Sequence, residues 1–222
     1  MKSLNTSSNI NSKDSTATAI FIFFLAFYFI QILLTFVFHT PIIDYTVIFS
    51  AILIMFLLHL KFRFNRYVPL FLGLTFIFHA LGFYRIIPYG NGQMAMLYGA
   101  PQLWYHYDWI VHVGGFFFAT LTACILFYNP IRKCAKSYAF ASLIFILAII
   151  GIGSLIEITE YAGFNLVGYG EGFLLLGDGD FAVKESVWDN SSMDQLSNLI
   201  GAMTGMIIFL AVFDRNPRRY SS

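Results

Sequence analysis

The chain has 222 residues, of which 58% are hydrophobic, 19% are aromatic and only 11% are charged, and its formal net charge is +1. Soluble domains carry about 25% charged residues, so this composition excludes an ordinary soluble domain, a disordered chain and a nucleic-acid binder with a basic surface. It predicts an integral membrane protein. The two cysteines, Cys124 and Cys134, form no zinc or redox motif.

Apolar segments along the chain predict the transmembrane helices, because the bilayer core needs about 20 apolar residues per helix. The first 17 residues are rich in Ser, Thr and Asn and predict a disordered tail. The run that follows is too long for the core of a signal peptide, so we interpret it as a retained span. The predicted fold is an all-α, polytopic membrane helix bundle with six spans at 18–39, 42–60, 68–87, 107–128, 138–163 and 192–213.

The distribution of Lys and Arg predicts the orientation of these spans. The two tails and the second and fourth connections would share one side, and together they carry 11 of the 13 basic residues. Arg85 and Lys184 are the two exceptions. Both termini, 1–17 and the basic tail 214–222, are therefore predicted to be cytoplasmic in a multi-pass protein of the cytoplasmic (inner) membrane.

Polar side chains of the last four spans are expected toward the outer half of the bilayer, with His79 near mid-membrane. In chain order they are His79, Tyr84, Arg85, Asp108, His112, Glu157, Glu160, Tyr161, Asp189, Asp194 and Asn198. Asp108 and His112 are four residues apart, so they share one helix face. An ionised carboxylate at the bilayer centre costs at least about 2.5 kcal/mol. Glu157 and Glu160 should therefore face the bundle interior, paired with His112, Arg85, a metal or shared protons.

Each of these residues also has a simpler explanation. Asp194 fits a helix N-terminal cap, since Ser191-x-x-Asp194 resembles a capping box, and Asp108 fits an acidic first turn. His79 alone is more often a helix–helix hydrogen-bond donor than a ligand. His39 and His59 lie at span ends, where an interfacial position is expected. Gly201-x-x-x-Gly205 favours close packing within the bundle, and homodimerisation is the minority interpretation.

The predicted outer loop 164–191 contains an apolar patch inside a glycine-rich segment. Such a patch is typical of an ordered lid or a re-entrant segment over the outer site. The alternative is a flexible loop whose apolar residues rest on lipid headgroups. Asp178 and Asp180 are a weak calcium signal, because the rest of a calcium loop is missing.

Several motifs together resemble a known family. They are Tyr107-Asp108-x-x-x-His112, Glu157-x-x-Glu160, the loop from Gly170 to Asp180, Trp188-Asp189 followed by Asp194 and Asn198, and His79-x-x-Gly82-x-Tyr84. In order and spacing over about residues 75–205 they resemble the YjdF-like inner-membrane proteins, which are distantly similar to VanZ-like proteins. The resemblance implies the topology and the site rather than a reaction. Tyr161 departs from the pattern, which has Trp there, and its hydroxyl could join the site.

Three functions fit this pattern. The first is a membrane-embedded hydrolase or transferase that uses a divalent metal and acts on a lipid or lipid-linked substrate. Oxygen and imidazole ligands suit zinc, manganese, iron or magnesium, and the candidate catalytic residues are Asp108, His112, Glu157, Glu160 and Asp194, with Asp189 as a further ligand. His79, Tyr84, Arg85, Tyr161 and Asn198 would support the site.

The second function is a proton- or cation-coupled transporter, because intramembrane carboxylates and histidines are typical of ion pathways. Against it, the cluster lies near one surface, and the sequence shows neither an inverted repeat nor a broken helix pair. The third is a non-catalytic membrane protein in which a polar network only holds helices together. Among the three, the sequence favours the enzyme, whose partners would be membrane lipids.

Overall fold

The computed structural model of the chain describes residues 6–38, 42–82, 87–89, 93–95, 107–135, 137–167 and 187–214. The long elements in these ranges are all helices, as the composition predicts. The two strands are short and form an antiparallel hairpin in which Ile87 pairs with Ala95. In chain order the elements are α1 Thr6–Phe38, α2 Ile42–Phe62, α3 Tyr67–Thr75, α4 Ile77–Gly82, β1 Ile87–Tyr89, β2 Gln93–Ala95, α5 Tyr107–Ala135, α6 Tyr138–Val167, α7 Val187–Ile208 and the π-helical turn η2 Phe209–Asp214.

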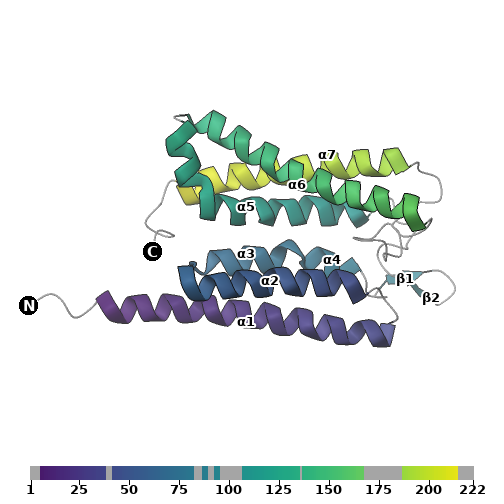
Figure 1. Cartoon of the computed structure of the whole chain (residues 1–222), viewed down its shortest axis with the longest axis horizontal. Coiled ribbons are helices and arrows are strands. Elements are labelled where there is room, and N and C mark those ends of the chain that lie inside the picture. Colours follow the sequence, from purple (N-terminus) through teal and green to yellow (C-terminus); the bar gives the residue numbers. More distant parts are fainter. Residues whose placement is uncertain are drawn as a thin grey trace, which may run out of the picture.

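The helices form two groups with one interface between them (Figure 1). α1 and α2 pack on each other and on α3, whereas α5, α6 and α7 pack on one another in all three pairings. α3 and α4 also pack on α5, so this pair of short helices joins the two groups. The start of α1, the α2–α3 and α5–α6 turns and the end of η2 lie at one end of the bundle (Figure 1). The hairpin, the start of α5, the end of α6 and the start of α7 lie at the other end.

Five described helical segments are long and apolar enough to cross a membrane: Ser15–Leu34, Tyr45–Phe62, Trp109–Ala135, Tyr138–Thr159 and Ser191–Asp214. Large apolar side chains cover their outward faces, and more than half of the surface is exposed at Phe23, Leu147, Leu155 and Ile207. A water-soluble bundle would bury such faces against another element. Length, composition and surface together indicate a multi-pass membrane protein.

The third predicted span, 68–87, is not one continuous helix. α3 ends at Thr75 and α4 begins at Ile77, because Phe76 leaves the helical conformation with φ −104° and ψ 1°. The Thr75 hydroxyl donates to the Phe71 carbonyl at 2.9 Å, and hydrogen bonds of this kind bend helices. The third predicted span is therefore an interrupted helix that forms a shorter apolar stretch, Tyr67–Leu81.

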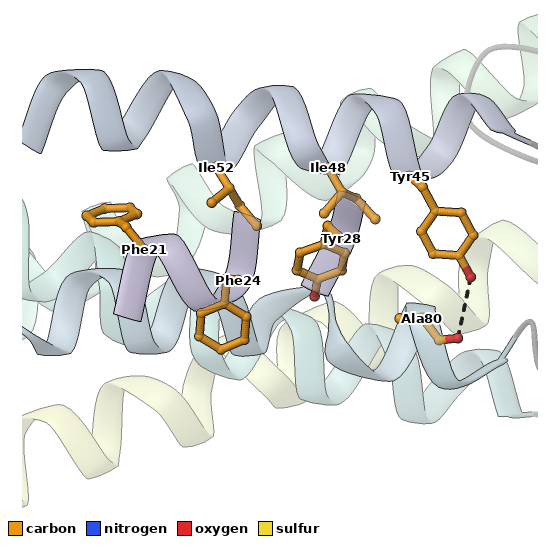
Figure 2. Close-up of a cluster of buried hydrophobic side chains, with 7 residues drawn as sticks. All are labelled: Phe21, Phe24, Tyr28, Tyr45, Ile48, Ile52 and Ala80. Carbon is orange, nitrogen blue, oxygen red and sulfur yellow. Dashed lines mark hydrogen bonds between the residues drawn. The ribbon is translucent and has the colours of Figure 1, made fainter. Parts of the chain in front are cut away.

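Two buried tyrosines from the neighbouring helices support the interrupted segment (Figure 2). The Tyr28 hydroxyl on α1 donates to the Gly73 carbonyl at 2.9 Å, and the Tyr45 hydroxyl on α2 donates to the Ala80 carbonyl at 3.4 Å. Inside a membrane, backbone groups near a helix interruption depend on donors from neighbouring helices. The hydroxyls belong to a buried cluster with Phe21, Phe24, Ile48, Ile52 and Ala80.

We expect Tyr28→Phe to lower the free energy of unfolding by about 1–3 kcal/mol, because it leaves a buried carbonyl without this donor. Tyr45→Phe serves as the comparison. The hydrogen bond from Tyr45 to the Ala80 carbonyl is longer, at 3.4 Å, so its removal should lower the free energy of unfolding by less. Thermal unfolding of both variants in one detergent measures the difference, and wild-type stability of Tyr28→Phe would show that its hydroxyl contributes nothing.

Several element boundaries differ from the predicted ones. The tail 1–17 was expected to be disordered, but α1 begins at Thr6, because an established apolar helix extends into adjacent residues without a new nucleation cost. α6 continues to Val167 and α7 begins at Val187, so the predicted loop 164–191 is shorter at both ends. The remaining loop, with Asp178 and Asp180, and the tail 215–222 lie outside the described residues.

His59 lies in the last turn of α2 and is fully buried by other side chains. Its Nε2 lies 3.2 Å from Thr18 Oγ1 on α1. Its ring packs against the rings of Phe21 and Phe64, with centroid distances of 5.3 and 6.1 Å. His59 therefore connects the last turn of α2 to α1, through the contact with Thr18 and the packing against Phe21.

Candidate metal centre

Three of the predicted site residues meet from three different helices. His112 lies on α5, Glu157 on α6 and Asp194 on α7, and one ligand atom of each lies within 4.8 Å of the other two. His112 Nε2 is 3.9 Å from Asp194 Oδ1. The exposed fractions are 12% for the His112 side chain, 5% for Glu157 and 1% for Asp194. We call these three residues the His–Glu–Asp cluster.

The helix topology explains why residues so distant in sequence are neighbours. His112 lies in the second turn of α5, and Asp194 lies in the third turn of α7. Glu157 lies about three turns before the end of α6, which runs in the opposite direction. All three positions therefore fall toward the end of the bundle that carries the hairpin, away from the basic α2–α3 and α5–α6 turns (Figure 1).

Two glycines of α7 bring this helix directly against α5. A Cβ atom at Gly201 would lie 2.4 Å from the Val113 carbonyl oxygen, and one at Gly205 would lie 2.7 Å from the Phe117 carbonyl oxygen. Both distances are too short for any side chain, so the two backbones are in contact. The prediction that Gly201-x-x-x-Gly205 serves close packing within the bundle is confirmed.

Asp194 is not a helix cap. α7 begins at Val187, seven residues earlier, whereas only the first four N–H groups of a helix need a capping acceptor. The alternative that Asp194 merely caps a helix is therefore wrong. Its carboxylate is buried inside the bundle beside His112.

Asn198 and Phe116 hold the ring of His112. The ring stacks on that of Phe116, with 6.1 Å between centroids and 11° between planes. His112 Nδ1 lies 2.8 Å from Oδ1 of Asn198. An amide oxygen only accepts, so in this contact Nδ1 is the donor, and Nε2 lies on the side of Asp194.

Burial makes the charge of this cluster costly. Two ionised carboxylates in a poorly solvated site repel each other, so they must share a proton or face a cation. A protonated histidine supplies one positive charge, and a divalent metal supplies two. The cluster can hold a metal ion, since it offers an imidazole nitrogen and two carboxylate oxygens from three rigid helices.

The spacing of the donor atoms is compatible with a metal site. Ligand bonds of about 2.1 Å place two donors at most about 4.2 Å apart, and the three donor atoms here lie within 4.8 Å of one another. His112 Nε2 and Asp194 Oδ1 are 3.9 Å apart, which is already inside that limit. The residues present therefore fit a metal ion.

The other predicted site residues fall into two groups. His79 is half-buried on α4 and does not belong to the cluster, and Tyr161 is 58% exposed. In the second group, three residues lie on described helices, but their side chains are not described: Asp108, Glu160 and Asp189. Tyr84 and Arg85 lie outside the described residues.

Two polar residues beside the cluster were missed by the sequence reasoning. The Ser154 hydroxyl on α6 donates to Gln195 Oε1 on α7 at 3.1 Å. Ser154 precedes Glu157 by three residues and Gln195 follows Asp194 directly, so both lie beside predicted site residues in sequence. The helical i, i+3 spacing of Ser154 and Glu157 was an available signal, whereas Gln195 only adjoins Asp194 in sequence.

Comparison with family models, curated proteins and solved structures found no match to the chain.

Proposed function

We propose that the chain is a metal-dependent membrane enzyme that acts on a lipid or lipid-linked substrate. The observation that carries this proposal is the burial of His112, Glu157 and Asp194 side by side. A purely structural network has no need for two carboxylates in one place, because each must be neutralised at a cost in stability. The motif order of the YjdF-like family supports the topology and the site rather than the reaction, and we propose membership of that family.

The proposed reaction is hydrolysis or group transfer. A divalent metal such as zinc, manganese, iron or magnesium would supply Lewis acidity that activates water or polarises a phosphoryl oxygen. His112 Nε2, Glu157 and Asp194 would hold it, and a carboxylate oxygen left without a metal bond would accept a proton as general base. Glu160, Asp108 and Asp189 are proposed to complete the site. The apolar helix faces around the cluster favour a substrate that arrives through the lipid.

One observation favours a proton- or cation-coupled transporter as the second candidate. α3 and α4 form an interrupted helix at Phe76, and interrupted helices line ion sites in many transporters. The interruption lies on helices that contribute nothing to the His–Glu–Asp cluster. The enzyme therefore remains the better proposal.

Activity assays in a membrane separate the two candidates. Protein loaded with zinc or manganese in nanodiscs that contain phospholipids and lipid pyrophosphates should form headgroup products detectable by mass spectrometry. Chelation and Asp194→Asn should each abolish them, because both remove the metal. Proton or cation flux into proteoliposomes that Asp194→Asn abolishes, without product formation or metal dependence, would instead establish the transporter.

We further propose six spans, with α3 and α4 as one crossing, and both termini in the cytoplasm. An even number of crossings agrees with the start of α1 and the end of η2 at one end of the bundle (Figure 1). Reporter fusions at residue 222 and within 170–180 should report opposite compartments, the first cytoplasmic. A periplasmic signal from residue 222 would contradict the topology and place the cluster in the inner leaflet.

A further inference from the structure

Asn198 is completely buried in the membrane-spanning part of α7, one turn after Asp194. A buried amide costs free energy unless its polar atoms are hydrogen-bonded. Its Oδ1 accepts the bond from His112 Nδ1, whereas its Nδ2 has no hydrogen-bond partner within the described part of the chain. A residue that only filled space would be apolar here, so the bond to His112 is the reason that an amide occupies this position.

A glycine on the facing helix makes room for this amide. A Cβ atom at Gly153 on α6 would lie 2.5 Å from Asn198 Nδ2 and 3.0 Å from the Phe116 ring. The amide therefore lies directly on the α6 backbone, one turn before Glu157. A Cβ atom at Gly151, two residues earlier, would meet nothing within 4 Å. The amide of Asn198 therefore needs a glycine at position 153 but not at position 151.

We propose that Asn198 is a positioning residue that sets the tautomer of His112, and that Gly153 holds the amide in the required place. This inference rests on the proposed metal site. With its proton on Nδ1, the ring presents the lone pair of Nε2 to the side where Asp194 lies at 3.9 Å. A proton on Nε2 would block ligation through that atom. Metal-bound histidines recurrently donate their other N–H to an oxygen, and loss of that oxygen lowers metal affinity about 10–100-fold.

Two substitutions of Asn198 distinguish positioning from space filling. Asn198→Leu keeps the size and removes the acceptor, so zinc affinity, measured by competition with a chelator in nanodiscs, should fall about 10–100-fold. Asn198→Asp keeps an acceptor oxygen and should restore the affinity to within a few-fold of wild type. If Asn198 only filled space, Asn198→Leu should bind zinc better than Asn198→Asp, because leucine suits an apolar site and a further buried charge is costly there.

The tautomer can be measured without any metal. Nitrogen-15 spectra of chelator-treated wild type should show His112 protonated at Nδ1, with the signal assigned by its loss in His112→Gln. Asn198→Leu should shift the ring toward the form protonated at Nε2. Wild type protonated at Nε2 and not at Nδ1 overturns the proposal, whether or not the variants fold.

Gly153→Ala and Gly151→Ala form a matched pair on one helix. Gly153→Ala should displace the amide and weaken zinc binding, while Gly151→Ala should leave it unchanged. Equal affinity of both variants would overturn the role of Gly153. Zinc binding that Asn198→Leu does not weaken would overturn the positioning role and leave the proposed function intact. Wild type that shows the Nδ1 tautomer but binds no metal would overturn the proposed function alone.

Discussion

Glu157→Gln should abolish stoichiometric metal binding and make the melting temperature insensitive to a chelator. The substitution keeps the size of the side chain and removes the charge and one ligand oxygen of a cluster whose donor atoms lie within 4.8 Å. A metal that binds only the folded state stabilises it by about 2.7 kcal/mol at 100 times its Kd. Chelation should therefore lower the melting temperature of wild type, and elemental analysis of tag-free protein should find metal in wild type alone.

Asp214→Asn is the matched control for Glu157→Gln. Asp214 ends η2, 20 residues after Asp194, a separation of about 30 Å along a helix. Its substitution removes the same charge and should leave both metal content and chelator sensitivity unchanged. A structural polar network would behave differently, since Glu157→Gln would then be neutral or stabilising in every condition. Identical melting curves of metal-free wild type with and without chelator would count against the metal site.

Gly201→Ala should destabilise the bundle strongly for so small a change. The added methyl group would lie 2.4 Å from the Val113 carbonyl oxygen and 3.1 Å from the Phe117 backbone nitrogen. Backbone atoms cannot rotate away, so α7 must move from α5, and such overpacking costs about 1–3 kcal/mol. Thermal or denaturant unfolding in one detergent measures the loss. Metal affinity should fall as well, because the movement carries Asp194 away from His112.

Gly151→Ala is the control for this substitution too. It adds the same methyl group to a helix of the same bundle where nothing lies within 4 Å. Alanine has the higher helix propensity by about 1 kcal/mol, so the variant should be as stable as wild type or slightly more stable. Equal stability of Gly201→Ala and Gly151→Ala would show that α5 and α7 are not in backbone contact.

The sequence predicted that His112 and Glu157 belong to one site, but it did not decide the role of Asp194. His112 and Glu157 were predicted to share one site because a buried charge needs a partner, and the structure brings them together. For Asp194 the sequence left a cap and a ligand equally open, since both place an acid near a helix start. Only the position of the first residue of α7, Val187, decided between them.

His59 and Phe76 show where local patterns were insufficient. A histidine at the end of an apolar run has the same sequence signature whether it meets headgroups or another helix. Its burial depends on Thr18 and Phe21, which are about 40 residues away in sequence. The interruption at Phe76 has no glycine or proline at the break, and it coincides with hydroxyl donors from α1 and α2 near Gly73 and Ala80.

The sequence by itself determined that this is a helical membrane protein, because apolar segments of bilayer length can satisfy their backbone groups only as helices. It also determined the candidate ligands, because ionisable groups are too costly in a bilayer to be placed without a partner. The tertiary structure alone decided which of them meet: α5, α6 and α7 pack closely enough, through Gly201 and Gly205, to bring His112, Glu157 and Asp194 together. Contacts between helices depend on shape complementarity across residues far apart in the chain, so the Gly201-x-x-x-Gly205 pattern predicts close packing but does not identify α5 as the partner helix.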